Sequence, residues 1–185
     1  MAEVEMKRMG PELVASLPVV GTYREFSMHL DRLAAWLRER GVEPAGPAVG
    51  VFWSAPGGDG EGPGRARYEV QMPVQAELAG SQGVEVKVVP MRDYATLLYP
   101  GPVTPHETAR AYQRILEWAA RRGLEPSGPP REVYLGRPED LRRGELAAEL
   151  QVPVRPAEAR RGRARLQEEL APESSVLGRV GGGAG

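Results

Sequence analysis

The feature that most constrains this chain is a repeat within its own sequence. Residues 36–51 (WLRERGVEPAGPAVGV) align with residues 118–133 (WAARRGLEPSGPPREV) at an offset of 82. Residues 69–74 (EVQMPV) align in the same order with residues 149–154 (ELQVPV) at an offset of 80. A repeat of this length is a supersecondary unit that must pair with its neighbour to bury its apolar face. We therefore interpret the chain as a duplication.

Each repeat is predicted to contain a strand, a helix and two further strands. Strands are predicted at 13–20, 49–54 and 68–74, and at 94–99, 131–136 and within 145–154; apolar residues alternate along 68–74 and along the second half of 145–154. Helical spacing relates Phe26, Leu30, Leu33 and Leu37 in the first repeat, and Tyr112, Ile115, Leu116 and Ala119 in the second. A further strand at 84–89 would belong to the linker or open the second repeat. The prediction is an α+β fold: a duplicated strand–helix–strand–strand repeat with a central antiparallel sheet, two helices and a ligand cleft between the repeats.

Composition limits the chemistry that the chain can perform. There is no cysteine, so disulfides and thiolate nucleophiles are excluded, and with only two histidines we expect neither a metal nor a cofactor. The net charge of -1 gives no global attraction to nucleic acid or to anionic membranes. No apolar run approaches the roughly 20 residues of a membrane helix, and no secretory leader is visible. We expect a cytoplasmic protein.

The most informative difference between the repeats is Gly50 in the first against Glu132 in the second. Because side chains alternate along a strand, Glu132 shares a face with Tyr134, and Gly50 shares one with Phe52. If these strands line the cleft, a carboxylate and two rings face it, and Gly50 leaves room opposite the acid. Such a site suits a flat cationic ligand, and a buried carboxyl group also suits acid–base catalysis. The alternative is a solvated or arginine-paired Glu132.

Other aromatic residues are candidates for the walls of the cleft. Trp53 has an aliphatic counterpart in the second repeat, although strand alternation favours a core position for it. Tyr112 takes the place of Leu30 and would bring a polar tip inside. The predicted ligand-binding residues are Glu132, Tyr134, Phe52, Trp53, Tyr68, Tyr99, Tyr112 and Gly50. The matched Trp36 and Trp118 are interpreted as core anchors.

Several stretches together resemble the GyrI-like small-molecule-binding domain, which is also the effector domain of BmrR-type and Rob-type regulators. They are Gly21-Thr-Tyr, the LxxW of residues 33–36, the GxxPxGP of residues 41–47, VGVFW, REVYL and the two strands EVQMPV and ELQVPV. The resemblance covers about residues 13–154, and we expect a domain at 1–154 with repeats at 11–75 and 84–154. It implies a pocket between the repeats, with Glu132 as the counter-ion for cationic lipophilic compounds.

The resemblance leaves three functions open. The first is a stand-alone protein that binds hydrophobic, often cationic, small molecules. The second is a hydrolase of reactive compounds such as cyclopropane-type toxins, in which Glu132 would be catalytic. The third is a protein-interaction module such as a DNA gyrase inhibitor. No helix-turn-helix is present, so direct DNA binding is not expected, and the basic, Gly-rich residues 155–185 are predicted to be a mobile tail. The oligomeric state stays open.

Overall fold

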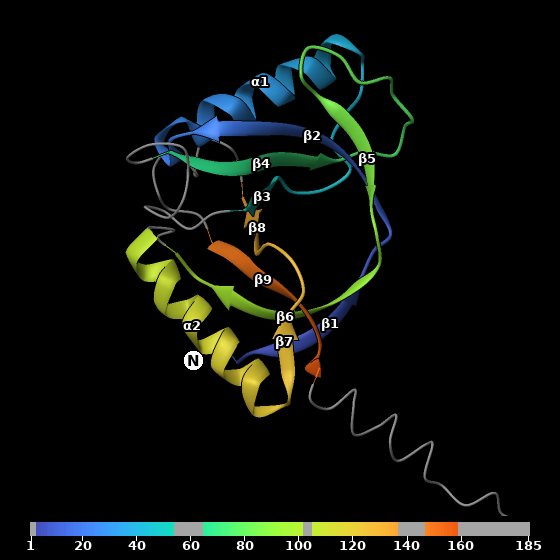
Figure 1. The fold of residues 1–185 in the computed structure, drawn as a ribbon. Coiled ribbons are helices and arrows are strands. Elements are labelled where there is room, and N and C mark those ends of the chain that lie inside the picture. Colours follow the sequence, from blue (N-terminus) through green and yellow to red (C-terminus); the bar gives the residue numbers. More distant parts are fainter. Residues whose placement is uncertain (1–2, 54–64, 102–104, 137–146, 159–185) are drawn as a thin grey trace, which may run out of the picture.

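The computed structural model describes residues 3–53, 65–101, 105–136 and 147–158. Within them, one curled antiparallel sheet carries two helices on one of its faces (Figure 1), which confirms the predicted α+β fold. The strands are β1 Glu5–Met9, β2 Glu12–Gly21, β3 Val49–Phe52, β4 Ala66–Pro73, β5 Glu85–Val89, β6 Arg92–Tyr99, β7 Leu124–Pro126, β8 Arg131–Leu135 and β9 Ala147–Pro156. A 3-10 turn at Tyr23–Glu25 precedes α1 Phe26–Glu39, and the second helix is α2 Pro105–Arg121.

The order of strands in the sheet is symmetrical about its centre. It runs β1-β6-β9-β8-β3-β4-β2-β5, with β7 attached to β9. The central pair, β3 and β8, sets Gly50 directly opposite Glu132. Strands that correspond in the sequence alignment therefore lie at equal distances from the centre, as expected for two similar units that pair along one edge.

The two outer strands are exchanged between the halves of the sheet. β1 comes first in the chain but pairs with β6, whereas β5 precedes β6 and pairs with β2. The sequence of β1, EMKRM, aligns with EVKVV of β5 at the offset of 80 seen elsewhere. β1 and the three-residue β7 were missing from the predicted elements. Charged residues interrupt the apolar alternation in β1, so its hydropathy pattern gives no strand signal.

The core lies between the helices and the sheet. Phe26, Leu30, Leu33 and Leu37 of α1 are buried as predicted, as are Ile115 and Ala119 of α2. Leu116 is 38% exposed, because it lies on the flank of α2 beside the buried stripe. The strands contribute the residues that alternate toward the helices, among them Val70, Met72, Leu150 and Val152.

Both helices end in the same way. Gly41 and Gly123 have φ angles of 66° and 68°, the left-handed conformation that glycine adopts without strain at a helix end. One turn earlier, Trp36 and Trp118 each lie under an arginine guanidinium, at 3.9 and 3.8 Å from the ring centroid. Trp36 is buried and Trp118 packs partly buried against the core, as predicted for anchors.

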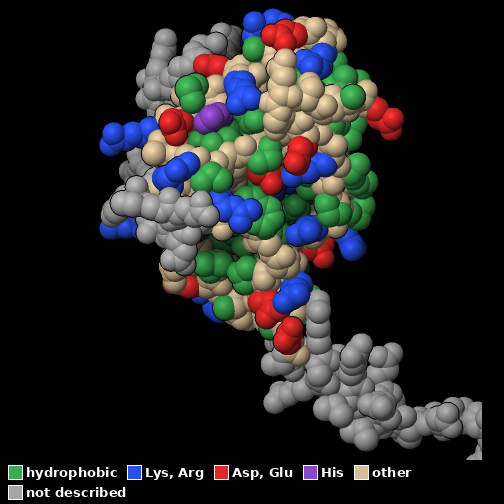
Figure 2. Space-filling model, turned by 45° about the horizontal axis from the view of Figure 1, so that its top comes forward, with side chains coloured by type: hydrophobic (Ala, Val, Ile, Leu, Met, Phe, Trp, Pro, Cys, Tyr) green, Lys and Arg blue, Asp and Glu red, His purple; other side chains and the backbone are tan. Residues whose placement is uncertain are grey.

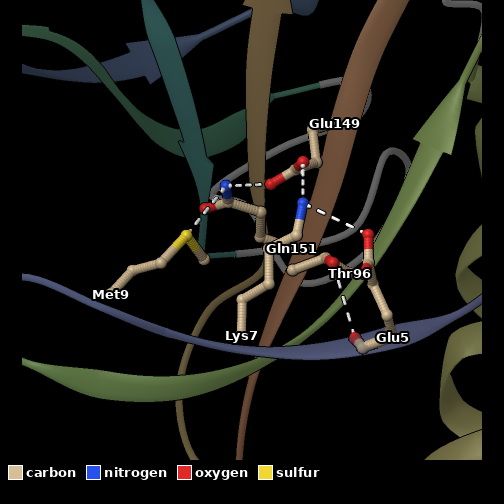
Figure 3. Close-up of polar contacts among 6 residues, drawn as sticks. All are labelled: Glu5, Lys7, Met9, Thr96, Glu149 and Gln151. Atoms are coloured by element: carbon tan, nitrogen blue, oxygen red, sulfur yellow. Dashed lines mark hydrogen bonds and ion pairs between the residues drawn. The ribbon is translucent and has the colours of Figure 1, made fainter.

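The face of the sheet that carries no helix holds two polar clusters, one in each half. In the first, Glu69 accepts hydrogen bonds from Ser16, Gln71 and Lys87 at 2.7–2.8 Å. In the second, Glu149 accepts hydrogen bonds from Lys7 at 2.7 Å and Gln151 at 2.9 Å (Figure 3). Lys87 is on β5 and Lys7 on β1, so each exchanged strand is tied to the other half by an ion pair.

Candidate functional site

The candidate site is built on the central strands, on the face that carries the helices. The partners of Glu132 and Tyr134 in β9 are Leu150 and Ala148, which belong to the core under the helices. The side chains of Glu132 and Tyr134 therefore point between α1 and α2, as strand alternation predicted. Glu132 is only 7% exposed, so this carboxyl group lies out of water in the interior of the domain.

Two tyrosine hydroxyls hold the carboxyl group of Glu132. Tyr134 donates to Oε2 at 2.8 Å, and Tyr112 of α2 donates to Oε1 at 3.2 Å. Among the described residues, Glu132 has no ion-pair partner. Burial raises the pKa of Glu132 above its ordinary value, and the two hydroxyls offset that effect only in part. The solvated or arginine-paired alternative is therefore not what the structure has.

The acid raises the pKa of its neighbours in turn. Burial, and then the charge of Glu132, raise the pKa of Tyr23 to about 12. The same two causes raise the pKa of Tyr112 and Tyr134 well above the ordinary value. These phenols therefore stay protonated near neutral pH, where they can donate hydrogen bonds to the carboxylate.

The wall nearest to α1 is aromatic. The ring of Phe26 lies 5.3 Å from that of Tyr134, edge to face, and 5.8 Å from that of Tyr68. Tyr23 lies 5.3 Å from Phe52 and 5.5 Å from Tyr68, centroid to centroid. Together with Glu132 and Tyr112, these rings are called the Glu132 site below. A buried acid beside ring faces is an environment that stabilises an apolar cation.

Gly50 provides space in this site. A Cβ atom at this position would lie 2.7 Å from Cζ of Phe52 and 3.0 Å from the hydroxyl oxygen of Tyr134. Any side chain here would displace the ring or the hydroxyl that binds the acid. The close approach explains why the residue opposite Glu132 is a glycine.

Not every predicted residue belongs to this group. The structure brings together Glu132, Tyr134, Phe52, Tyr68 and Tyr112 around Gly50. It does not bring in Trp53, which is 54% exposed and donates through Nε1 to Glu69 on the opposite face, at 3.1 Å. Tyr99 packs partly buried against the core from β6, and no described contact joins it to Glu132.

Sequence reasoning missed two residues of the site, Tyr23 and Phe26. Phe26 carried a signal, since it begins the apolar stripe of α1, but that stripe does not distinguish core from site. Tyr23 stands in the Gly21-Thr-Tyr stretch at the start of the helix. Its place beside Phe52 and Tyr68 depends on how the 3-10 turn crosses the sheet, which local sequence does not fix.

Three further observations concern the described part of the chain as a whole. On the face shown in Figure 2, acidic and basic side chains are intermixed, with hydrophobic side chains between them. In the described ranges, no three His, Cys, Asp or Glu side chains come together as a metal site would need. Neither described helix is long and apolar enough to cross a membrane. Residues 54–64, and residues 159–185 of the predicted tail, lie outside the described residues.

Solved structures share this fold. The C-terminal domain of EcmrR matches with a TM-score of 0.70 at 16% identity, over 85% of this chain and 99% of that one. A hydrolase encoded by lin2189 from Listeria innocua matches with a TM-score of 0.56 at 14% identity, over 82% and 92% of the two chains. At such low identity, these likenesses establish the fold alone.

Comparison of sequences identifies the family. No curated protein matches the chain. The model of the GyrI-like small molecule binding domain matches residues 2–155, which include every described strand but the last residue of β9, and both helices. The chain therefore belongs to the GyrI-like family of small-molecule-binding domains.

Proposed function

We propose that this domain binds hydrophobic cations at the Glu132 site, with the carboxylate as counter-ion and the rings as walls. The observation that carries the proposal is a buried acid that is held by two hydroxyls and has no cationic partner among the described residues. Burying a carboxylate without a compensating charge is costly, and a bound cation would supply that charge.

The two sides of the site suit different parts of such a ligand. The charge would lie toward Glu132, between β8 and α2. The flat apolar part would lie against Phe26, Phe52 and Tyr68, which come from α1, β3 and β4. Each cation–ring contact contributes about 0.5–2 kcal/mol, more as water is excluded.

The test compares a cation with a neutral molecule of similar shape. Tetraphenylphosphonium and triphenylphosphine oxide would be titrated into the full chain by isothermal calorimetry. The expected result is preferential binding of the cation, weakened about tenfold or more by Glu132→Gln, since a contact to a charged group is worth about 1.5–3 kcal/mol. Glu12→Gln is the matched control, because it removes an acid from the opposite face. Equal binding of both probes, or no effect of Glu132→Gln, would contradict the proposal.

The pH dependence gives an independent check. The pKa of Glu132 is raised by burial, so the carboxylate that attracts a cation is lost as pH falls through this raised value. Affinity for tetraphenylphosphonium should therefore decline in mildly acidic solution, before ordinary exposed carboxyl groups titrate. An affinity that stays flat over that range would mean that Glu132 is not the counter-ion.

A hydrolase is the second candidate, and two observations favour it. A neighbour with this fold is described as a hydrolase, and a carboxyl group with a raised pKa is suited to proton transfer near neutral pH. Glu132 would then take a proton from the attacking water. Consumption of an electrophilic substrate by the wild type and not by Glu132→Gln would support this function. Cation binding without any turnover would favour the first.

A further inference from the structure

A cavity lies on the face of the sheet that carries no helix. Its volume is about 350 Å³, within the range of small-molecule sites. The walls include Met9, Val49 and Val89, and the polar lining consists of Glu12, Arg131 and Gln151. Arg131 and Glu132 are neighbours on β8, so strand alternation sends one side chain to each face and sets this cavity behind the Glu132 site.

Arg131 is a buried cation with an incomplete set of partners. The residue is 8% exposed. Its Nη1 donates to the hydroxyl of Tyr94 at 3.3 Å, and its Nη2 contacts Oε2 of Glu12 at 3.4 Å. Its Nε has no hydrogen-bond partner in the described part of the chain. The only described carboxylate on this guanidinium is thus held by one long contact, and it belongs to a half-exposed side chain.

An unused acceptor lies across from this unused donor. Gln151 is directly opposite Arg131 in the pairing of β8 with β9, and it is 4% exposed. Its Nε2 donates to Glu149 and approaches the sulfur of Met9 (Figure 3). Its Oε1 has no partner among the described residues. Oε1 of Gln71, its counterpart in the other half, has no described partner either. Buried polar atoms are nearly always satisfied in folded proteins, so the unpartnered Nε of Arg131, which has no counterpart in the other half, is the observation that points to a ligand.

Arg131 also departs from the symmetry of this face. Glu69, Gln71 and Lys87 correspond to Glu149, Gln151 and Lys7, and they make equivalent contacts. The counterpart of Arg131 is Val49, an apolar residue that lines the same cavity. The arginine is therefore not needed to hold the exchanged strands, which the two lysines do in both halves.

We propose that this cavity binds a small amphiphilic carboxylate. One edge of the Arg131 guanidinium, Nε with Nη2, matches the two oxygens of a carboxylate, a geometry that arginine favours. Nε is shielded while Glu12 lies against Nη2, so the ligand would reach this edge as Glu12 turns away. The ligand would displace Glu12 from Nη2, and that side chain is exposed enough to turn into water. The apolar part of the ligand would lie against Val49, Val89 and Met9, and a hydroxyl or amine donor near the carboxylate would reach Oε1 of Gln151.

The test uses hexanoate and its neutral amide, hexanamide, as probes of the full chain by calorimetry. Hexanoate should bind more tightly than hexanamide. Arg131→Gln should weaken hexanoate about tenfold or more, as expected for the loss of charged hydrogen bonds. Glu12→Gln should strengthen hexanoate several-fold, because it removes the competing carboxylate without altering the cavity walls.

A second variant protects the test against a folding defect. Should Arg131→Gln unfold the chain, Arg131→Lys keeps the charge and removes the two-pronged edge, and it should still weaken hexanoate. Equal binding of hexanoate and hexanamide would overturn the proposal. So would hexanoate binding that neither Glu12→Gln nor the arginine variants change. Either result would assign the cavity to ordered water.

Discussion

The two faces of the sheet differ in how closely their residues match between the two halves. On the face without helices, the residues that bind the exchanged strands are of the same kind in both halves and make the same contacts: Glu69 binds Lys87 as Glu149 binds Lys7. Arg131, whose counterpart is Val49, is an exception on this face. On the face with helices, the residues around Glu132 differ between the halves: Gly50 matches Glu132, and Tyr68 of β4 matches Ala148 of β9. The symmetrical contacts hold the halves together, and the differences make the site one-sided.

A comparison of two buried acids shows what this division does. Burial tends to raise the pKa of Glu69, but hydrogen bonds from Lys87, Ser16 and Gln71 outweigh it and hold that pKa below its ordinary value. Glu132 lies deeper in the interior and has hydroxyl donors in place of an ammonium group, so burial prevails and its pKa is raised. The charge of Glu69 is therefore balanced within the fold, whereas that of Glu132 is not balanced by a cation among the described residues.

The largest effect is expected from making the two halves more alike at the centre. Gly50→Ala would set a methyl group 2.7 Å from Phe52 and 3.0 Å from the Tyr134 hydroxyl. Overpacking of this kind should lower the free energy of unfolding by about 1–3 kcal/mol, measured by urea denaturation. Gly46→Ala is the control, because its Cβ would meet Pro73 no closer than 3.4 Å. Equal stability of the two variants would mean that the site can accommodate a methyl group, and that Gly50 is not required opposite Glu132.

The next effect tests whether the face without helices is symmetrical in energy as well as in geometry. Lys87→Met and Lys7→Met should each lower the free energy of unfolding by about 1 kcal/mol, a modest value because both lysines are over a third exposed. The lowered pKa of Glu69 stabilises the fold above the ordinary carboxyl pKa, and this contribution is lost as pH falls through the lowered value. The deficit of Lys87→Met should therefore be largest near neutral pH and shrink in acid.

Urea denaturation of both variants at several pH values measures this effect. Glu39→Gln, which alters an exposed acid at the end of α1, serves as a control for a change of surface charge. A large loss in one lysine variant and none in the other would break the comparison. It would show that one exchanged strand, β1 or β5, is held mainly by its backbone pairing.

The sequence predicted the symmetrical parts of the molecule better than the one-sided parts. The offset alignment placed both helices and the inner strands, and alternation placed Glu132 and Tyr134 on one face. β1 was not predicted because its charged residues give it the hydropathy of a solvated loop. Its strand character follows from its pairing with β6. Contacts of Tyr23 and Phe26 with Phe52 depend on where a turn and a helix lie over the sheet. Such long-range placement is decided by packing, so no local sequence pattern predicts it.

Trp53 shows the same limit from the other side. Its lack of an aromatic counterpart suggested a wall of the site, while alternation sent it away from Phe52. The structure follows alternation in the choice of face, where the indole donates to Glu69. The core position expected for Trp53 is wrong, because the side chain is 54% exposed at the end of its strand. A difference between the repeats thus locates a candidate for function, but the direction of the side chain decides which face that candidate serves.

The smallest effect has the opposite sign and separates the two acids most sharply. A folded-state pKa raised above the unfolded value contributes stability only at low pH, and this is lost as pH rises through the raised value. Near neutral pH the charge of Glu132 is therefore a cost, and Glu132→Gln removes it while its carbonyl oxygen can still accept from Tyr134. Near neutral pH, the free energy of unfolding of this variant should be roughly 0.5 kcal/mol higher than that of the wild type, and this gain should vanish in acid. Urea denaturation across that range, with Glu69→Gln as the matched variant, measures the difference.

Glu69→Gln should lose stability near neutral pH because it breaks the pairing with Lys87. If both variants lost stability equally, Glu132 would be a structural acid like Glu69, and its demand for a cation would be met within the chain.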